Sequence, residues 1–150
     1  MDKIVSKFIS NGLFFQQVRT YLNEGKQVQF SLRGSSMSPF LYEGDLVTVK
    51  SLENTELKVG HIVLAYAEIG YVMHRIIRID SQLIYLAGDA NFVQIEKIAN
   101  NALIAFLTAA TRDGREIPIY ASHILWLARM WYYARPIRRI WAKACKSLRK

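Results

Sequence analysis

Two residues of this chain have the types and the sequence context that nucleophilic catalysis needs. Ser36 lies in the run GSSMSP at 34–39, and His74 lies in the run MHRI at 73–76. A serine hydroxyl is a weak nucleophile until a base removes its proton, and neutral imidazole, with an unperturbed pKa of about 6.5, suits that transfer near neutral pH. The two residues are far apart in the sequence, so we expect adjacent strands rather than local spacing to bring them together.

The residues around Ser36 favour an exposed hydroxyl. Gly34 lets the chain turn sharply before the serine, and Pro39 stiffens the exit. The main-chain N–H of Ser36 is then a natural donor to an oxyanion, and Ser35 and Ser38 are further candidates for this role.

A third signature, GDAN at 88–91, follows these two runs, and the strand-like pattern FLYEGDLVTV lies at 40–49. With these signatures in this order, the chain resembles the signal peptidase family from about residue 28 to about residue 118. His74, where other members carry Lys, makes it similar to the endoplasmic-reticulum and archaeal type. The resemblance implies a serine peptidase that forms an acyl-enzyme at Ser36 and cleaves secretory signal or leader peptides beside small residues.

A carboxylate is expected to hold the imidazole tautomer and to stabilise the imidazolium. Asp89, in the GDAN signature, is our first candidate. The His-type signal peptidases carry their catalytic Asp further along, where this chain has Ile95, and the acid nearest to that position is Glu96, which is the alternative. A role for Asp89 in shaping its turn is a third interpretation. We expect neither a metal nor a cofactor, because no His, Cys and carboxylate cluster has metal-ligand spacing.

The pattern of apolar residues predicts a mainly β fold, a coiled antiparallel sheet or partly open barrel, and the resemblance implies that this fold is of the signal-peptidase type. An Asp-Gly turn at 112–115 is expected to form a hairpin that returns the chain into 116–119. The chain divides into an N-terminal amphipathic helix (1–26), a catalytic β domain (27–119) and a basic, aromatic helical tail (120–150). Period-two alternation or apolar runs predict strands at Gln27–Arg33, Leu46–Lys50, His61–Ala67, Tyr71–Asp80, Leu83–Ala87 and Leu103–Thr111.

Helices are predicted at both ends of the chain. The segment 2–23 has helical periodicity with a kink near Gly12, and no apolar run approaches the roughly 20 residues of a membrane span, so we expect neither a signal peptide nor a transmembrane anchor. In the tail, Ser122 is expected to cap a helix that runs to about Ala134, and Pro136 fits the first turn of a second helix.

The tail carries the excess positive charge. Residues 112–150 contain ten Lys and Arg against only Asp113 and Glu116, which accounts for the net charge of +8. The second tail helix segregates an apolar stripe from a basic arc, as in-plane membrane helices do. The stripe is Ile137, Ile140, Trp141, Ala144 and Leu148, and the arc is Arg138, Arg139, Lys143, Lys146, Arg149 and Lys150.

These observations predict a peripheral membrane-associated serine endopeptidase at the cytoplasmic face. Its expected partners are a peptide or precursor-protein substrate and, through 120–150, an anionic membrane surface. Nucleic acid is not expected, because no recognised nucleic-acid module accompanies the tail. Packing of the apolar stripe on the body is the alternative for the tail. For the whole chain, the alternatives are a catalytically silent membrane-surface adaptor on the same fold and a self-processing peptidase, as in the self-cleaving SOS repressors of the wider clan.

Overall fold

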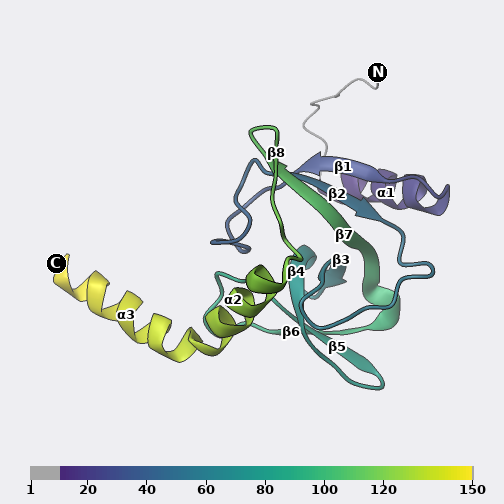
Figure 1. The fold of residues 1–150 in the computed structure, drawn as a ribbon. Helices are drawn as coiled ribbons and strands as arrows, with labels where there is room; N and C mark the ends of the chain where they lie inside the picture. Colours follow the sequence, from purple (N-terminus) through teal and green to yellow (C-terminus); the bar gives the residue numbers. More distant parts are fainter. Residues whose placement is uncertain (1–10, 150) are drawn as a thin grey trace.

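Eight strands form one curled antiparallel sheet in the computed structural model, which describes residues 11–149 (Figure 1). The strand order is β1-β2-β7-β3-β4-β5-β6, and β8 pairs with β7. The mainly β, coiled-sheet prediction is confirmed. The strands are β1 (Val28–Ser31), β2 (Leu46–Lys50), β3 (Ile62–Ala67), β4 (Gly70–Ile79), β5 (Leu83–Ala87), β6 (Glu96–Ala99), β7 (Leu103–Arg112) and β8 (Arg115–Glu116), with a 3-10 turn, η1, at Asn100–Ala102.

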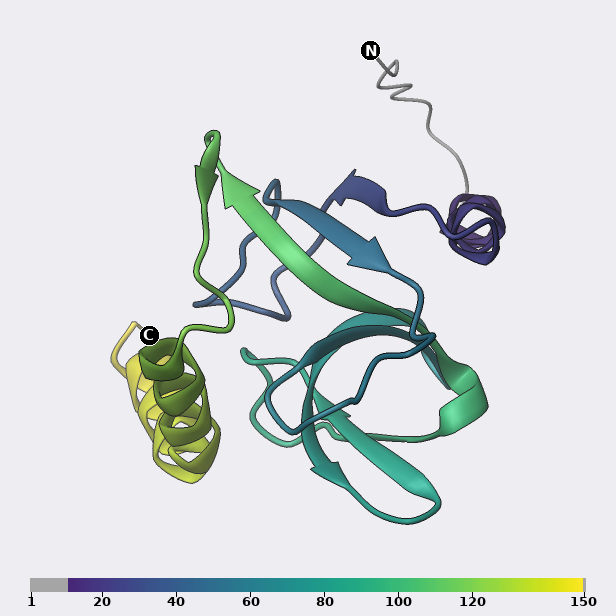
Figure 2. The same ribbon diagram turned by 45° about the vertical axis from the view of Figure 1, so that its right-hand side comes forward.

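Irregular pairing accounts for the curl of the sheet. The register shifts at Thr48/Val49 between β2 and β7, at Leu64/Ala65 between β3 and β7, and between Ile76 and Arg78 where β4 meets β5. An extra residue on one strand bends that strand and increases its right-handed twist. Figure 2 shows the result, a sheet that wraps round on itself as a half-barrel.

Most strands lie where the alternation predicts them, and β2 and β5 have the predicted bounds. The Asp-Gly hairpin is confirmed, since Asp113 and Gly114 both have positive φ. The returning strand β8 is shorter than predicted, because Pro118 has no N–H to continue the ladder. Strand β6 was not predicted, because its four residues contain two charges and too short an alternation to stand out.

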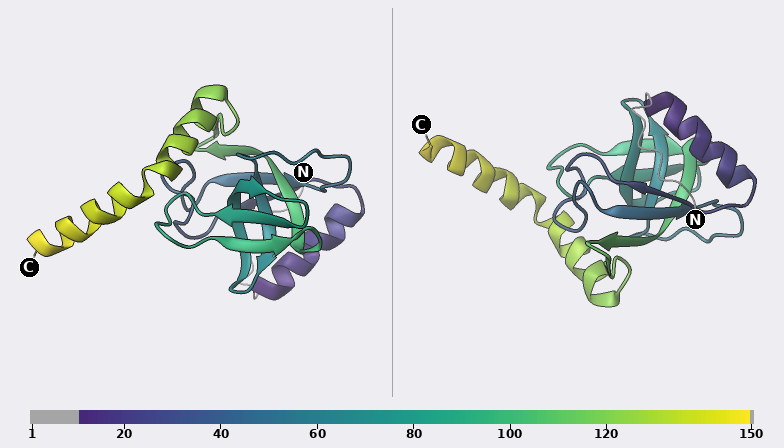
Figure 3. Two further views of the ribbon diagram at one scale, coloured as in Figure 1. Left: turned by 90° about the horizontal axis from the view of Figure 1, so that it is seen from below. Right: turned by 90° about the horizontal axis from the view of Figure 1, so that it is seen from above.

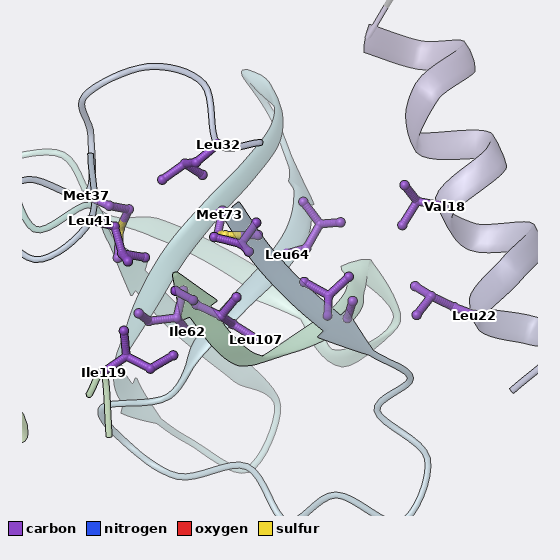
Figure 4. Close-up of a cluster of buried hydrophobic side chains, with 14 residues drawn as sticks. Val18, Leu22, Leu32, Met37, Leu41, Ile62, Leu64, Met73, Leu107 and Ile119 are labelled. Atoms are coloured by element: carbon purple, nitrogen blue, oxygen red, sulfur yellow. The ribbon is translucent and has the colours of Figure 1, made fainter. Parts of the chain in front are cut away.

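Two clusters of buried side chains form the core, and the larger one includes Val18 and Leu22 of helix α1 (Asn11–Asn23), which packs against the sheet (Figure 4). At the opposite end of the same cluster, Met37 and Leu41 are buried beside Ile62 of β3. Their burial anchors the loop that carries Ser36 to the sheet. The part of the predicted N-terminal helix at 2–10 lies outside the described residues.

Two helices follow the sheet, α2 (Ser122–Tyr133) and α3 (Arg135–Leu148), and Figure 3 shows α3 extending away from the body. Pro136 lies in the first turn of α3, as predicted. The predicted cap is wrong by one residue: Ala121 occupies the N-cap position, its backbone is extended, and Ser122 is already helical. Among residues 11–149 no helix combines the length and the apolar character that crossing a membrane requires.

Candidate active site

Ser36 lies in the loop between β1 and β2, partly exposed, while its neighbour Met37 is almost fully buried. Gly34 has a φ of 81°, in the left-handed region that glycine adopts without strain, so the sharp turn predicted before the serine is present. The Met37 side chain is part of the core, whereas Ser36 lines a cleft.

His74 lies on β4 and contacts the Ser36 hydroxyl. Its Nε2 is 3.2 Å from Ser36 Oγ, and its Nδ1 is 2.8 Å from Oε2 of Glu96. An ionised carboxylate can only accept a hydrogen bond, so the Nδ1–H donates to Glu96 and Nε2 is left to accept from the serine hydroxyl. This chain of contacts has the geometry that general-base activation of a serine requires.

Glu96 reaches His74 from two strands away. It begins β6 and pairs with Leu86 of β5, and Leu86 in turn pairs with Ile76 of β4. Both side chains of the His74–Glu96 pair are about 95% buried. Among the described residues, the second carboxylate oxygen of Glu96, Oε1, has no hydrogen-bond partner. The only side chain that hydrogen-bonds to this carboxylate, among the described residues, is therefore His74.

Asp89, our first candidate for the orienting acid, contacts Arg75 instead of His74. Arg75 donates Nε to Oδ1 at 2.9 Å and Nη2 to Oδ2 at 2.8 Å, and its Nη1 donates to the carbonyl of Gly60. Arg75 follows His74 on β4 and so points to the opposite face of the strand. Burial raises the pKa of Asp89, while the hydrogen bonds from Arg75 oppose that rise. The contacts of Asp89 are those of a loop-bracing ion pair.

Gly88 allows the GDAN loop to lie directly on the nucleophile. A Cβ at this position would stand 2.7 Å from the Ser36 carbonyl oxygen, closer than real Cβ atoms come to backbone, and 3.0 Å from His74 Nε2. The N–H of Ala90 also donates to the Ser36 carbonyl at 2.9 Å. The loop thus holds the serine backbone against the histidine.

A cleft of about 260 Å³ opens in front of Ser36 and His74. Tyr71, Asn91 and Gln94 are among the residues that line it. The Ser36 N–H makes no hydrogen bond with other described residues and is available as a donor. Ser38 is a poor helper, because its hydroxyl donates to the Ser35 carbonyl at 2.9 Å.

The tail contacts the GDAN loop, which the sequence did not suggest. Trp131 of α2 donates its indole N–H to the carbonyl of Asp89 at 2.9 Å, and Arg138 of α3 donates to the same oxygen at 3.1 Å. Arg138 also stacks on the Trp131 ring at 3.9 Å, and Arg135 donates to the Phe92 carbonyl at 3.0 Å. No sequence signal reveals contacts between side chains and carbonyls more than 40 residues apart. Arg75 could have been noticed, since it lies inside the MHRI run.

In comparisons with known proteins, no protein-family model and no curated protein matches this chain. The site unites Ser36, His74 and Glu96 in one contact chain and places Asp89 outside it.

Proposed function

We propose that this chain is a serine endopeptidase of the signal-peptidase type, with Ser36 as nucleophile, His74 as general base and Glu96 as the group that orients the imidazole. The observation that carries the proposal is the unbroken contact chain from Ser36 Oγ through both ring nitrogens of His74 to Glu96. The hydroxyl, the base and the acid come from a loop and two strands, each anchored by buried neighbours.

In the proposed reaction, His74 Nε2 takes the proton of Ser36 as Oγ attacks the carbonyl carbon of the scissile peptide bond. The carbonyl oxygen becomes an oxyanion, which accepts a hydrogen bond from the main-chain N–H of Ser36. Glu96 stabilises the imidazolium, which then gives its proton to the leaving amine as the C–N bond breaks. Water, deprotonated by the same imidazole, then attacks the carbonyl carbon of the acyl-enzyme. The bond from that carbon to Ser36 Oγ breaks, the imidazolium returns its proton to Oγ, and the product leaves as a carboxylic acid.

The edge of β4 supports an extended peptide as the substrate. Pairing between β4 and β5 begins at Arg75, so residues 70–74 pair with β3 on one side only. Backbone groups on such a free edge can hydrogen-bond to a strand laid alongside. We propose that a signal or leader peptide lies there, with small residues beside the cut because the cleft holds only about 260 Å³.

The tail supports peripheral attachment to an anionic membrane at the cytoplasmic face. Ile137, Ile140, Trp141 and Leu148 on the apolar stripe of α3 are between 69% and 87% exposed rather than packed on the body. An exposed apolar stripe beside basic residues binds at the headgroup level of a bilayer. The substrate and the enzyme would then meet at the same surface.

Labelling with a fluorophosphonate, which reacts with activated serines, tests the proposal. We expect wild type to be labelled and Ser36→Ala to be unlabelled, with peptide cleavage lost by roughly a thousandfold or more. His74→Gln should lose reactivity to a similar extent, because no base remains. Ser35→Ala and Ser38→Ala are the matched controls and should keep most of it. Equal labelling of Ser36→Ala and wild type would exclude a serine peptidase with Ser36 as its nucleophile. Membrane binding without any labelling of wild type would favour the catalytically silent membrane-surface adaptor.

A further inference from the structure

A second hollow, of about 840 Å³, lies between the loop at 92–93 and the elbow where α2 meets α3. Its basic lining residues are Arg135, Arg139 and Lys143, which recur every four residues and so share one side of α3. No carboxylate lines it among the described residues. The hollow therefore concentrates positive charge with no local counter-charge.

Arg135, which lines the hollow, has a guanidinium nitrogen that donates no hydrogen bond to the described residues. The residue is only 9% exposed, and its Nε is occupied by the Phe92 carbonyl, but its Nη1 is buried without an acceptor among the described residues. A buried guanidinium N–H without a partner is unfavourable. An anion with several oxygen acceptors would satisfy this donor on a small rearrangement of the side chain.

The remaining lining residues are apolar or aromatic, Tyr132 and Tyr133 among them. Phe92, Val93 and Ile140 line it, and Val93 and Ile140 are both well exposed. Ile140 also belongs to the apolar stripe of α3, so the cationic site adjoins the surface proposed to enter the membrane. A ligand that suits it carries an anionic group next to an alkyl chain.

We propose that this hollow binds the phosphate of an anionic phospholipid, with its acyl chain along Ile140 and Val93. The inference rests on the proposed membrane association and goes beyond it, since attraction of a basic helix to a charged surface needs no defined site. Asn91 and Gln94 line the catalytic cleft, while Phe92 and Val93, between them, line the hollow. A bound headgroup thus sets the cleft at the level of the membrane surface.

Matched charge removals on α3 test the site by vesicle co-sedimentation. One full-length variant carries Arg139→Ala and Lys143→Ala, and the control carries Lys146→Ala and Arg149→Ala, which do not line the hollow. All four residues are exposed, and circular dichroism checks the fold. Vesicles of phosphatidylcholine contain either phosphatidylglycerol or oleate, adjusted to equal zeta potential.

On oleate vesicles, both variants should lose binding equally, by roughly fivefold for each charge removed. On phosphatidylglycerol vesicles, the variant in the hollow should lose about tenfold more than the control, as expected for a lost charge-assisted hydrogen bond. Equal losses there, or the same extra loss on oleate, would overturn the phosphate site and leave membrane association standing. Displacement by inorganic phosphate would show a free-anion site and overturn the lipid assignment. If wild type binds neither vesicle, both this inference and the membrane proposal fail, while fluorophosphonate labelling still reports on the peptidase.

Discussion

Two buried carboxylates lie near His74, and each has a different partner. Glu96 accepts from the imidazole at 2.8 Å, whereas Asp89 is held by two nitrogens of Arg75. A carboxylate on the imidazole acts on the tautomer and on the charge that develops during proton transfer. One on an arginine acts on the position of a loop. The two residues should therefore fail in different ways when they are neutralised.

Glu96→Gln is expected to lower kcat by about a hundredfold or more with little change in KM, because the amide cannot stabilise the imidazolium. Asp89→Asn should mainly lower stability, by about 3 kcal/mol, because it leaves a buried guanidinium unpaired. Steady-state kinetics and chemical unfolding on the same samples separate the two effects. A larger loss of kcat in Asp89→Asn than in Glu96→Gln would restore Asp89 as the orienting acid.

At the scale of elements, the elbow between α2 and α3 helps to hold the GDAN loop in place. Trp131 and Arg138 both donate to the Asp89 carbonyl, and the neighbouring Ala90 N–H donates to the Ser36 carbonyl. The contacts run from the tail through the GDAN loop to the nucleophile. The tail is thus expected to position the catalytic serine as well as to meet the membrane.

Trp131→Phe removes the indole N–H and keeps an aromatic ring under Arg138. We expect kcat on a short soluble peptide to fall about fivefold with KM unchanged, the effect of one net hydrogen bond of about 1 kcal/mol on serine placement. Trp126→Phe is the control, because Trp126 is 60% exposed on the same helix. Equal kcat values for the two variants would show that the elbow does not act on the site.

An ion pair between Asp45 and Arg112 joins the residue just before β2 to the end of β7. Asp45 is 2% exposed and accepts Nε and Nη2 of Arg112, both at 2.7 Å, and the N–H of Tyr42. Burial acts to raise the pKa of Asp45, but these hydrogen bonds outweigh it and hold the pKa below its usual value. The folded state therefore binds the Asp45 proton less readily than the unfolded chain.

Because the pKa of Asp45 is depressed, the stabilisation by the Asp45–Arg112 ion pair depends on pH, and the sign of this dependence is known. The stabilisation is fully present above the unfolded pKa of about 3.9 and is lost as the pH falls through the lower folded pKa. Asp45→Asn should cost about 2 kcal/mol of unfolding free energy at neutral pH, and the gap to wild type should close in acid. Urea unfolding across pH measures it, with Asp113→Asn in the exposed hairpin as control. A gap that stays constant into acid would contradict the assignment.

At the scale of the molecule, the proposed catalytic site and the proposed membrane-binding helix lie in separate parts that the elbow joins. Residues 112–150 carry the whole net charge of +8, and α3 extends from the body with its apolar stripe exposed (Figure 3). Because Arg138 contacts the active-site loop, removing all of 136–150 would disturb both parts at once. A shorter truncation can separate them.

Deleting 140–150 keeps Arg135 and Arg138 and removes most of the stripe and four basic residues. We expect the truncated protein to dissociate from anionic vesicles and to cut lipid-embedded substrates poorly, while a short soluble peptide is cut at close to the wild-type rate. Binding of the intact chain should weaken as salt rises, because the Debye length is about 8 Å at physiological ionic strength. Co-sedimentation and peptide kinetics report the two properties separately. An intact chain that ignores anionic vesicles at low salt would exclude the membrane proposal.

The sequence by itself predicted the β-rich class, most strands, the Asp-Gly hairpin and both tail helices, because these follow from local periodicity and turn chemistry. It also placed Ser36 and His74 in motifs, but the expectation that adjacent strands bring them together is wrong. Ser36 lies in the loop between β1 and β2, which β7 and β3 separate from β4 in the sheet, so the curl of the sheet makes the contact. Only the tertiary structure decided between Glu96 and Asp89, since the choice depends on the register of β4, β5 and the unpredicted β6. The hydrogen bonds from Trp131 and Arg138 to the Asp89 carbonyl are likewise known only from the tertiary structure. Period and propensity act over a few residues, whereas these contacts join segments up to 49 residues apart that packing alone brings together.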